Sequence, residues 1–126
     1  MPYISIEFLK GRTLARRQEF AGRVVAAALE CFASTPDRVR IVHREVDASE
    51  LAGGLAVAMP LISVEILKGR TLDQRRDFVR RVAAAAAELL DTPAETMRVL
   101  FRELELTEVA RGAVLAADAQ ARPAGS

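Results

Sequence analysis

The chain has 126 residues, enough for one domain with a buried core, and its 18 basic and 17 acidic residues leave a formal net charge of +1. This balance gives no reason to expect a nucleic acid or a charged membrane surface as a partner. One cysteine and one histidine are too few for a disulfide framework or a zinc site, so we expect no bound metal. No apolar run reaches the roughly 20 residues that span a bilayer, and the N-terminus lacks the pattern of a signal peptide. We therefore expect a cytoplasmic protein.

The sequence consists of two similar copies. A shift of 58 residues places Pro2 on Pro60 and aligns the chain with itself without a gap, with about 26 of 58 positions identical. The segment LKGRTL recurs unchanged at residues 9–14 and 67–72. This is a tandem duplication. It predicts two units, 2–58 and 59–116, in one compact domain, followed by a flexible tail of small and polar residues at 117–126.

Each copy begins with the pattern of a half-buried strand. Ile4, Ile6 and Phe8 alternate with polar residues, and the same alternation recurs at 62–66. A glycine follows each of these strands. Thr13 and Thr71 then occupy the position of a helix N-cap, and Thr71 with Gln74 has the form of a capping box.

An amphipathic helix and a second strand complete each copy. The apolar stripe comprises Ala21, Val24, Val25, Ala28, Leu29 and Phe32 in copy one, and Val79, Val82, Ala83, Ala86 and Leu90 in copy two. Second strands follow at about 39–46 and 97–104. A strand–helix–strand unit favours a parallel pair with a right-handed crossover. The sequence thus predicts an α+β fold: tandem β-α-β units form a four-stranded sheet with two helices on one face. The other face also carries apolar residues, which favours oligomerisation.

The candidate catalytic group is an amine at the start of the chain. Bacteria usually remove an initiator methionine that precedes a residue as small as proline, so we expect the mature chain to begin at Pro2 with a free secondary amine. Burial against apolar neighbours such as Ile4 and Leu51, together with nearby arginines, lowers the pKa of this amine. A neutral amine at pH 7 can take up a proton and return it. Pro60 cannot do so, because its nitrogen is part of a peptide bond.

Four arginines at matching positions are candidates for binding the substrate. Arg12 and Arg70 come directly after the glycines that follow the first strands, and Arg40 and Arg98 lie at the start of the second strands. A guanidinium group binds a carboxylate through two parallel hydrogen bonds and keeps its charge. A guanidinium aimed at a carbonyl oxygen also stabilises an enolate. These properties suit a small mono- or dicarboxylate substrate.

The segment PYISIEFLKGRT, followed by Arg40, resembles the 4-oxalocrotonate tautomerase family of small β-α-β proteins with an amino-terminal proline base. The resemblance covers nearly all of residues 2–116, and the length is similar to that of fused members, in which one gene encodes what is elsewhere a dimer. It implies the tautomerase (MIF-like) fold. Because family members are commonly hexamers of short chains, it also implies a homotrimer of fused chains.

The resemblance also implies roles for particular residues. Pro2 becomes the base, with Arg12 and Arg40 at the family's carboxylate-binding positions in copy one and Arg70 and Arg98 at those positions in copy two. Sites lie between units, so Pro2 works with arginines of the other copy or of a neighbouring chain, and the sequence leaves open which. The family often has an aromatic residue where this chain has Leu51 and Val109, which departs from the pattern. Copy two also has Arg111 where copy one has Gly53, and we expect only the copy-one sites, three per trimer, to turn over.

The implied function is that of a cofactor-independent isomerase. It interconverts enol and keto forms of small unsaturated 2-hydroxy and 2-oxo acids similar to 2-hydroxymuconate or phenylenolpyruvate. Two alternatives stay open. One is cofactor-free hydration or dehalogenation of a short unsaturated acid, with a protonated proline as the acid and Asp37 or Glu45 activating water. The other is a ligand-binding relative that has lost turnover.

Three further residue types are expected to have structural roles. His43 aligns with Phe101 of the other copy, so it is predicted to pack in a core or an interface. Cys31 aligns with Leu89 and is predicted to be a small buried hydrophobic residue. Arg44 and Arg102 are predicted to form surface ion pairs.

Overall fold

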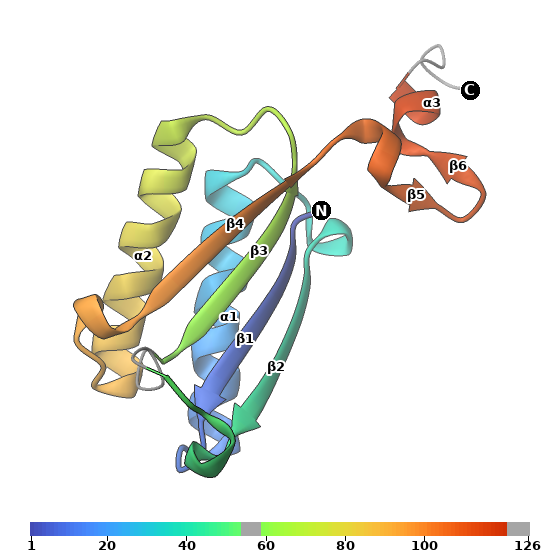
Figure 1. The fold of residues 1–126 in the computed structure, drawn as a ribbon. Helices are drawn as coiled ribbons and strands as arrows, with labels where there is room; N and C mark the ends of the chain where they lie inside the picture. Colours follow the sequence, from blue (N-terminus) through green and yellow to red (C-terminus); the bar gives the residue numbers. More distant parts are fainter. Residues whose placement is uncertain (54–58, 121–126) are drawn as a thin grey trace.

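The structure, a computed structural model, describes residues 1–53 and 59–120. Each copy supplies a strand, a long helix and a second strand (Figure 1). These are β1 (Tyr3–Leu9), α1 (Leu14–Cys31) and β2 (Arg40–Val46) in copy one, and β3 (Leu61–Leu67), α2 (Leu72–Leu90) and β4 (Arg98–Leu104) in copy two. The two strands of each copy run parallel, as predicted. The second strands begin one residue later than the sequence pattern indicated.

The four strands form one mixed sheet in the order β2-β1-β3-β4. The two copies meet along β1 and β3, which are antiparallel and place Ser5 opposite Ser63. These two serines occupy the same position in their copies, so an approximate two-fold axis passes through the pair. It follows that β1 starts at one end of the sheet and β3 starts at the other.

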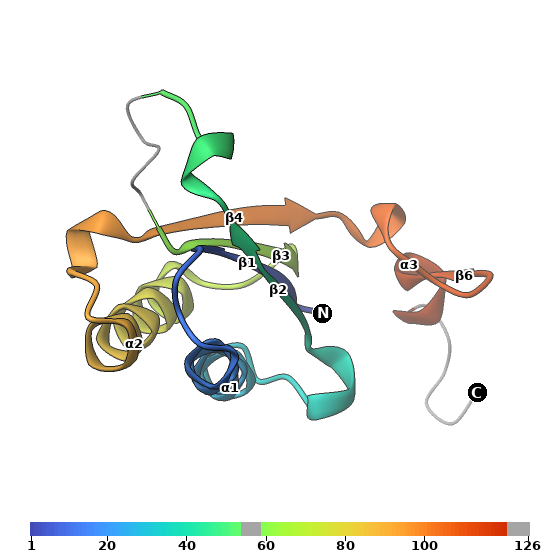
Figure 2. The ribbon, with the colours of Figure 1, turned by 90° about the horizontal axis from the view of Figure 1, so that it is seen from below.

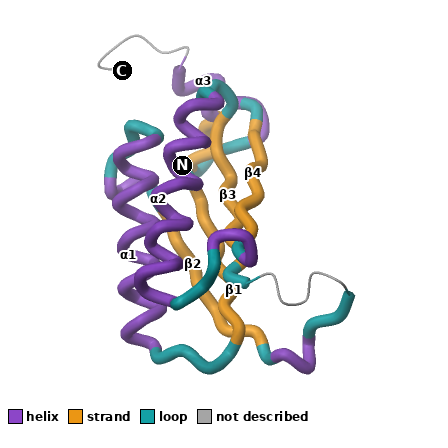
Figure 3. Tube along the Cα trace, turned by 90° about the vertical axis from the view of Figure 1, so that its left-hand side faces the viewer, coloured by secondary structure: helices purple, strands orange, loops and turns teal. Residues whose placement is uncertain are grey.

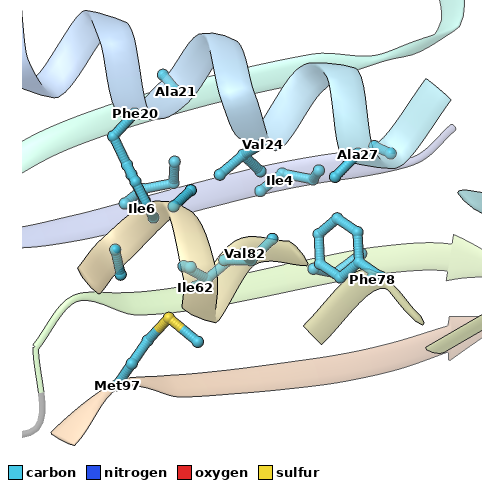
Figure 4. Packing of buried hydrophobic residues seen from close by; sticks show 14 of the residues in the cluster. Ile4, Ile6, Phe20, Ala21, Val24, Ala27, Ile62, Phe78, Val82 and Met97 are labelled. Atoms are coloured by element: carbon cyan, nitrogen blue, oxygen red, sulfur yellow. The ribbon is translucent and has the colours of Figure 1, made fainter. Parts of the chain in front are cut away.

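Both long helices lie on one face of the sheet (Figures 2 and 3), which confirms the predicted fold class. The inward-facing residues of the two central strands are almost completely buried beneath the helices (Figure 4). They are Ile4, Ile6, Phe8, Ile62, Val64 and Ile66. The predicted stripe on α1 is only partly correct: Phe20, Ala27 and Cys31 are buried, whereas Val25 and Leu29 are half-buried. The buried stripe is displaced because α1 packs against α2 as well as against the sheet.

The predicted helix starts are confirmed. The Thr13 hydroxyl accepts a hydrogen bond from the Arg16 backbone N–H (3.2 Å). Thr71 and Gln74 form a full capping box, in which each side chain accepts a hydrogen bond from the backbone N–H of the other residue. Gly11 and Gly69, in the turns before these caps, have φ angles of 132° and 116°, which favour glycine.

Short elements join and extend the two units. The 3₁₀ turns are η1 (Pro36–Arg38), η2 (Ala48–Glu50), η3 (Ala94–Thr96) and η4 (Leu106–Glu108). After β4 the chain forms a small hairpin, β5 (Ala110–Arg111) and β6 (Val114–Leu115), and a short helix α3 (Ala116–Gln120). Residues 117–120 of the expected tail therefore lie in a helix. Residues 121–126, and the end of copy one at 54–58, lie outside the described residues. No helix in the described part of the chain is long and apolar enough to span a membrane.

Candidate active site

The topology places the two prolines at opposite ends of the sheet. Pro2 precedes β1 and Pro60 precedes β3, and these strands are antiparallel. Both prolines are buried. Each carbonyl accepts a hydrogen bond (3.1 Å) from the backbone N–H of the arginine that begins the neighbouring strand, Arg40 for Pro2 and Arg98 for Pro60. The backbone surroundings of the two prolines are thus equivalent.

At the Pro2 end, charged groups from both copies converge on the start of the chain. The α-amino group belongs to Met1, and its pKa is lowered by burial first and then by the cations Arg38 and Arg70, while Asp37 opposes them. Arg70 comes from copy two. Its Nε is buried and has no hydrogen-bond partner in the described part of the chain. An uncharged amine is therefore favoured at this end.

Ser34 also lies at the Pro2 end, just after α1. Its hydroxyl donates a hydrogen bond to the Met1 carbonyl (3.2 Å). Removal of Met1 takes away this acceptor and leaves the hydroxyl beside the new terminus.

At the Pro60 end, Arg12 corresponds to Arg70 and is hydrogen bonded to residues of copy two. The Arg12 guanidinium donates hydrogen bonds to the Leu90 carbonyl and to the Thr92 hydroxyl (3.1 Å for the latter). Thr92 is buried and donates in turn to the same carbonyl. Arg12 therefore joins the turn between β1 and α1 to the last turn of α2 and the residue Thr92 that follows it. This contact lies at the opposite end of the sheet from Pro2.

The second-strand arginines face different surroundings. On β2, Val39 and Ile41 pack against the core, so the exposed Arg40 side chain lies on the opposite, open face of the sheet. There it lines a hollow of about 480 Å³ together with Tyr3, Val42, Leu100 and other residues of the four strands. Arg98 instead donates to the carbonyls of Glu95 (2.7 Å) and Met97 (3.0 Å) in its own copy.

The expectation that Leu51 neighbours Pro2 is wrong within one chain. Because β1 and β2 are parallel, with Leu9 opposite Val46, Leu51 lies beyond the end of the sheet where β1 finishes. Its counterpart Val109 follows β4, which ends where β1 begins, so the segment after β4 starts at the end of the sheet where Pro2 lies. The sequence analysis expected the apolar neighbour of Pro2 to come from copy one. Because β1 and β3 are antiparallel, the segment after β2 lies at the Pro60 end and the segment after β4 lies at the Pro2 end.

The predicted structural roles of three side chains are confirmed. His43 packs edge-on against Phe8, with ring centroids 5.9 Å apart. Cys31 is buried and donates to Asp77 (3.3 Å); burial first, and then this contact, raises the pKa of its thiol to about 11. Arg44 pairs with Glu7 across the sheet. The same prediction for Arg102 is wrong, because Arg102 forms no ion pair within the part of the chain that the structure describes.

Two residues at the Pro2 end were missed by sequence reasoning, namely Arg38 and Ser34. The signal that could have found Arg38 is the alignment of the copies, because copy two has Thr96 at that position. Ser34 aligns with Thr92, and this shared hydroxyl after each long helix is the signal that could have found it. Among the residues that the structure describes, no group of three or more potential metal ligands is close enough to hold an ion.

Comparisons with known proteins bear on both copies and on the whole fold. The family model described as "Tautomerase enzyme" matches residues 60–119, nearly all of copy two. A probable tautomerase of Listeria monocytogenes is 33% identical over 60 residues, which are 48% of this chain and 98% of that protein. A 2-hydroxymuconate tautomerase of Pseudomonas sp. is 41% identical over 46 residues, 36% of this chain and 73% of that protein. Each of these relatives therefore corresponds to about one copy.

The whole chain is similar in fold to solved structures of fused proteins. One, described as a wild-type fused 4-OT asymmetric trimer, superimposes with a TM-score of 0.85 at 22% identity and covers 96% of this chain and 100% of its own. A native fused 4-OT superimposes equally well, with a TM-score of 0.85 at 24% identity and the same coverage. The tandem β-α-β architecture, together with the relatives matched by a single copy, shows that the chain belongs to the 4-oxalocrotonate tautomerase family.

Proposed function

We propose that this protein is a cofactor-independent tautomerase with the amine of Pro2 as its general base. Its substrates are small unsaturated 2-hydroxy and 2-oxo acids similar to 2-hydroxymuconate or phenylenolpyruvate. The observation that carries the proposal is the convergence of Arg70, from copy two, on the amino terminus of copy one. A cation beside a buried amine is the combination that both binds an acid and keeps the amine neutral.

Pro2 is suited to this role only after Met1 is removed. Its nitrogen is then a secondary amine one residue further into the fold, where the proline itself is less than 2% exposed. Burial disfavours the charged form of an amine and neighbouring arginines add repulsion, so both effects lower the pKa of the Pro2 amine. Pro60 is also buried but has no amine.

The proposed reaction moves one proton. Arg70 binds a carboxylate of the enol through charged hydrogen bonds. The Pro2 nitrogen takes the proton of the 2-hydroxyl group, and the electron pair forms the C=O bond while the conjugated double bond shifts. The protonated proline then gives its proton to a carbon of the shifted chain, which yields the 2-oxo acid and restores the neutral amine.

We further propose that Arg40 acts in an assembly of three chains. The Arg40 side chain lies on the open face of the sheet with the exposed apolar residues Tyr3, Val42 and Leu100, and such a face is suited to packing against other chains. The fused 4-OT structures that this fold resembles are trimers. In a trimer Arg40 meets an active site at the boundary with a neighbour. Arg98, which is hydrogen bonded to carbonyls of its own copy, has a smaller role in substrate binding. Light scattering tests the assembly and is expected to give three times the mass of one chain.

The sharpest test keeps the proline and removes only its amine. A variant with one lysine inserted between Met1 and Pro2 is expected to retain methionine, because lysine is too large for efficient removal. Pro2 is then an internal amide in an otherwise unchanged sequence. We expect the loss of nearly all turnover of 2-hydroxymuconate and phenylenolpyruvate, followed by ultraviolet absorbance, while circular dichroism stays unchanged.

A matched insertion before Pro60, where no amine exists, is the control and is expected to leave turnover within about threefold of the unmodified protein. Intact mass must show that the active protein lacks Met1. An active preparation that retains Met1, or an inserted variant as active as the parent, contradicts the proposal.

A further inference from the structure

The two ends of the sheet differ in charge at two positions that the duplication aligns. Arg38 corresponds to Thr96, and Arg111 corresponds to Gly53. Two other charged residues near the chain start are kept in kind, because Arg70 corresponds to Arg12 and Asp37 to Glu95. Arg38 and Arg111 have no arginine counterpart in the other copy.

Although Arg38 and Arg111 are far apart in the sequence, the fold brings both to the Pro2 end. Arg38 ends η1, two residues before the strand residue Arg40, whose N–H binds the Pro2 carbonyl. Arg111 ends β5 in the hairpin that follows β4, and β4 finishes where β1 begins. The hairpin and the chain start lie at the same end of the molecule (Figures 1 and 2).

The charges at this end also act on one another. Arg38 acts on the α-amino group at the chain start, as Arg70 does. Arg111 acts on the carboxyl group of Asp37, whose pKa is lowered by the Thr35 hydroxyl (2.6 Å) first and by both arginines further down. Asp37 is therefore ionised at neutral pH and offsets one of the three cations.

The resulting balance differs between the ends. At the four compared positions, three arginines and one aspartate sum to +2 near Pro2, whereas Arg12 and Glu95 sum to zero at the equivalent positions of the Pro60 end. Arg38 and Arg111 are both exposed. Within the described residues, neither side chain forms an ion pair within 4.0 Å. Their guanidinium groups are thus available to a ligand.

We infer that Arg38 and Arg111 form a second anion-binding subsite at the Pro2 end, which selects acids that carry a further anionic group away from the reacting carbon. This inference rests on the proposed function, because it specifies the substrate of the same site. An acid with one carboxylate is bound without contact to Arg38 or Arg111. An acid with a second anionic group also contacts the exposed pair, whose contribution is screened by salt because it lies at the surface.

Binding of two non-reacting acids tests the subsite separately from catalysis. Muconate and sorbate share the same six-carbon diene and differ by one carboxylate. We titrate both into the full-length Pro2→Ala protein by calorimetry at low salt, and then into the same protein with Arg38→Thr, Arg111→Gly or both, which copy the residues of the Pro60 end.

We expect muconate to bind about tenfold more tightly than sorbate, and the double variant to lose most of this difference while its affinity for sorbate changes less than about twofold. Arg80→Thr removes one exposed arginine from α2, away from this end, and serves as the charge-matched control with both affinities unchanged. Three results overturn the subsite. They are an equal loss of affinity for both acids in the double variant, an undiminished preference for muconate in that variant, and no binding of muconate at millimolar concentration.

Failure of the proposed function gives a different result. If muconate is preferred through Arg38 and Arg111 but the unmodified protein turns over no enol, the subsite stands and the tautomerase proposal falls. If the protein turns over 2-hydroxymuconate and the double variant does so with unchanged KM, the subsite falls and the tautomerase proposal stands.

Discussion

At the Pro60 end of the sheet, Arg12 is hydrogen bonded to the last turn of α2, whereas at the Pro2 end its counterpart Arg70 has a buried Nε with no partner among residues 1–53 and 59–120. The two arginines come from identical LKGRTL segments. Their neighbours differ because only one end has the start of the chain. Equal sequence in two copies thus supports a structural contact at one end and leaves a free guanidinium at the other.

Replacing the prolines is expected to give the largest contrast. Pro2→Ala substitutes a primary amine for the secondary amine, and we expect kcat/KM to fall by about 10²-fold or more, as for loss of a positioned base. Pro60→Ala changes a residue without an amine, and we expect kcat/KM within about threefold of the parent. The measurement is turnover of 2-hydroxymuconate with Met1 removal checked by mass. Equal losses for the two variants refute the difference between the ends.

The arginines are expected to separate activity from stability. Arg70→Ala removes a guanidinium from the amine and is expected to lower kcat/KM by about 10²-fold with little change in the free energy of unfolding. Arg12→Ala removes hydrogen bonds from a charged donor to the Leu90 carbonyl and to Thr92, and is expected to lower the free energy of unfolding by about 1.5–3 kcal/mol. Steady-state kinetics measure the effect on activity and urea denaturation measures the effect on stability. A loss of stability in Arg70→Ala together with a loss of activity alone in Arg12→Ala contradicts the comparison.

The pH dependence of kcat/KM tests the charge at the Pro2 end. The neutral amine is the active form, so activity rises as pH rises through the pKa of the amine and then levels. Arg38 lowers the pKa of an amine here, so Arg38→Thr raises that pKa and moves the rising limb to higher pH. Thr96→Ala, at the aligned position, is expected to leave the limb in place. Activity that falls with rising pH points instead to a protonated proline acting as an acid.

The hydroxyl groups that follow the long helices are expected to give the smallest contrast. Thr92→Val removes a buried acceptor of Arg12 and is expected to cost about 1–2 kcal/mol of unfolding free energy. Ser34→Ala removes a half-buried hydroxyl whose acceptor, the Met1 carbonyl, is lost when Met1 is removed, and is expected to change stability by less than about 0.5 kcal/mol. Thermal unfolding of both variants distinguishes these values, and a larger loss for Ser34→Ala contradicts the comparison.

Local elements of this fold were predictable from the sequence, and their arrangement was predictable only in part. Alternating residues such as Ile4 and Ile6 predict a strand, and Thr71 with Gln74 predicts a helix start, because these signals depend on near neighbours. The antiparallel contact of β1 with β3 depends on tertiary packing. Leu51 was consequently placed at the wrong end, and Arg70 was not separated from the other candidate arginines. The two-residue strands β5 and β6 are too short to show any periodicity.

The pairing of Ser5 with Ser63 on the approximate two-fold axis has a consequence for circularly permuted proteins. A gene rearranged so that translation started at Met59 would encode the same two halves in reverse order, with the same strands in the same neighbourhoods. The free imino nitrogen would then emerge beside Arg12, in surroundings where the guanidinium is already occupied. Gene order would decide which half carries the free amine, and the side chains around it would decide whether that half is reactive.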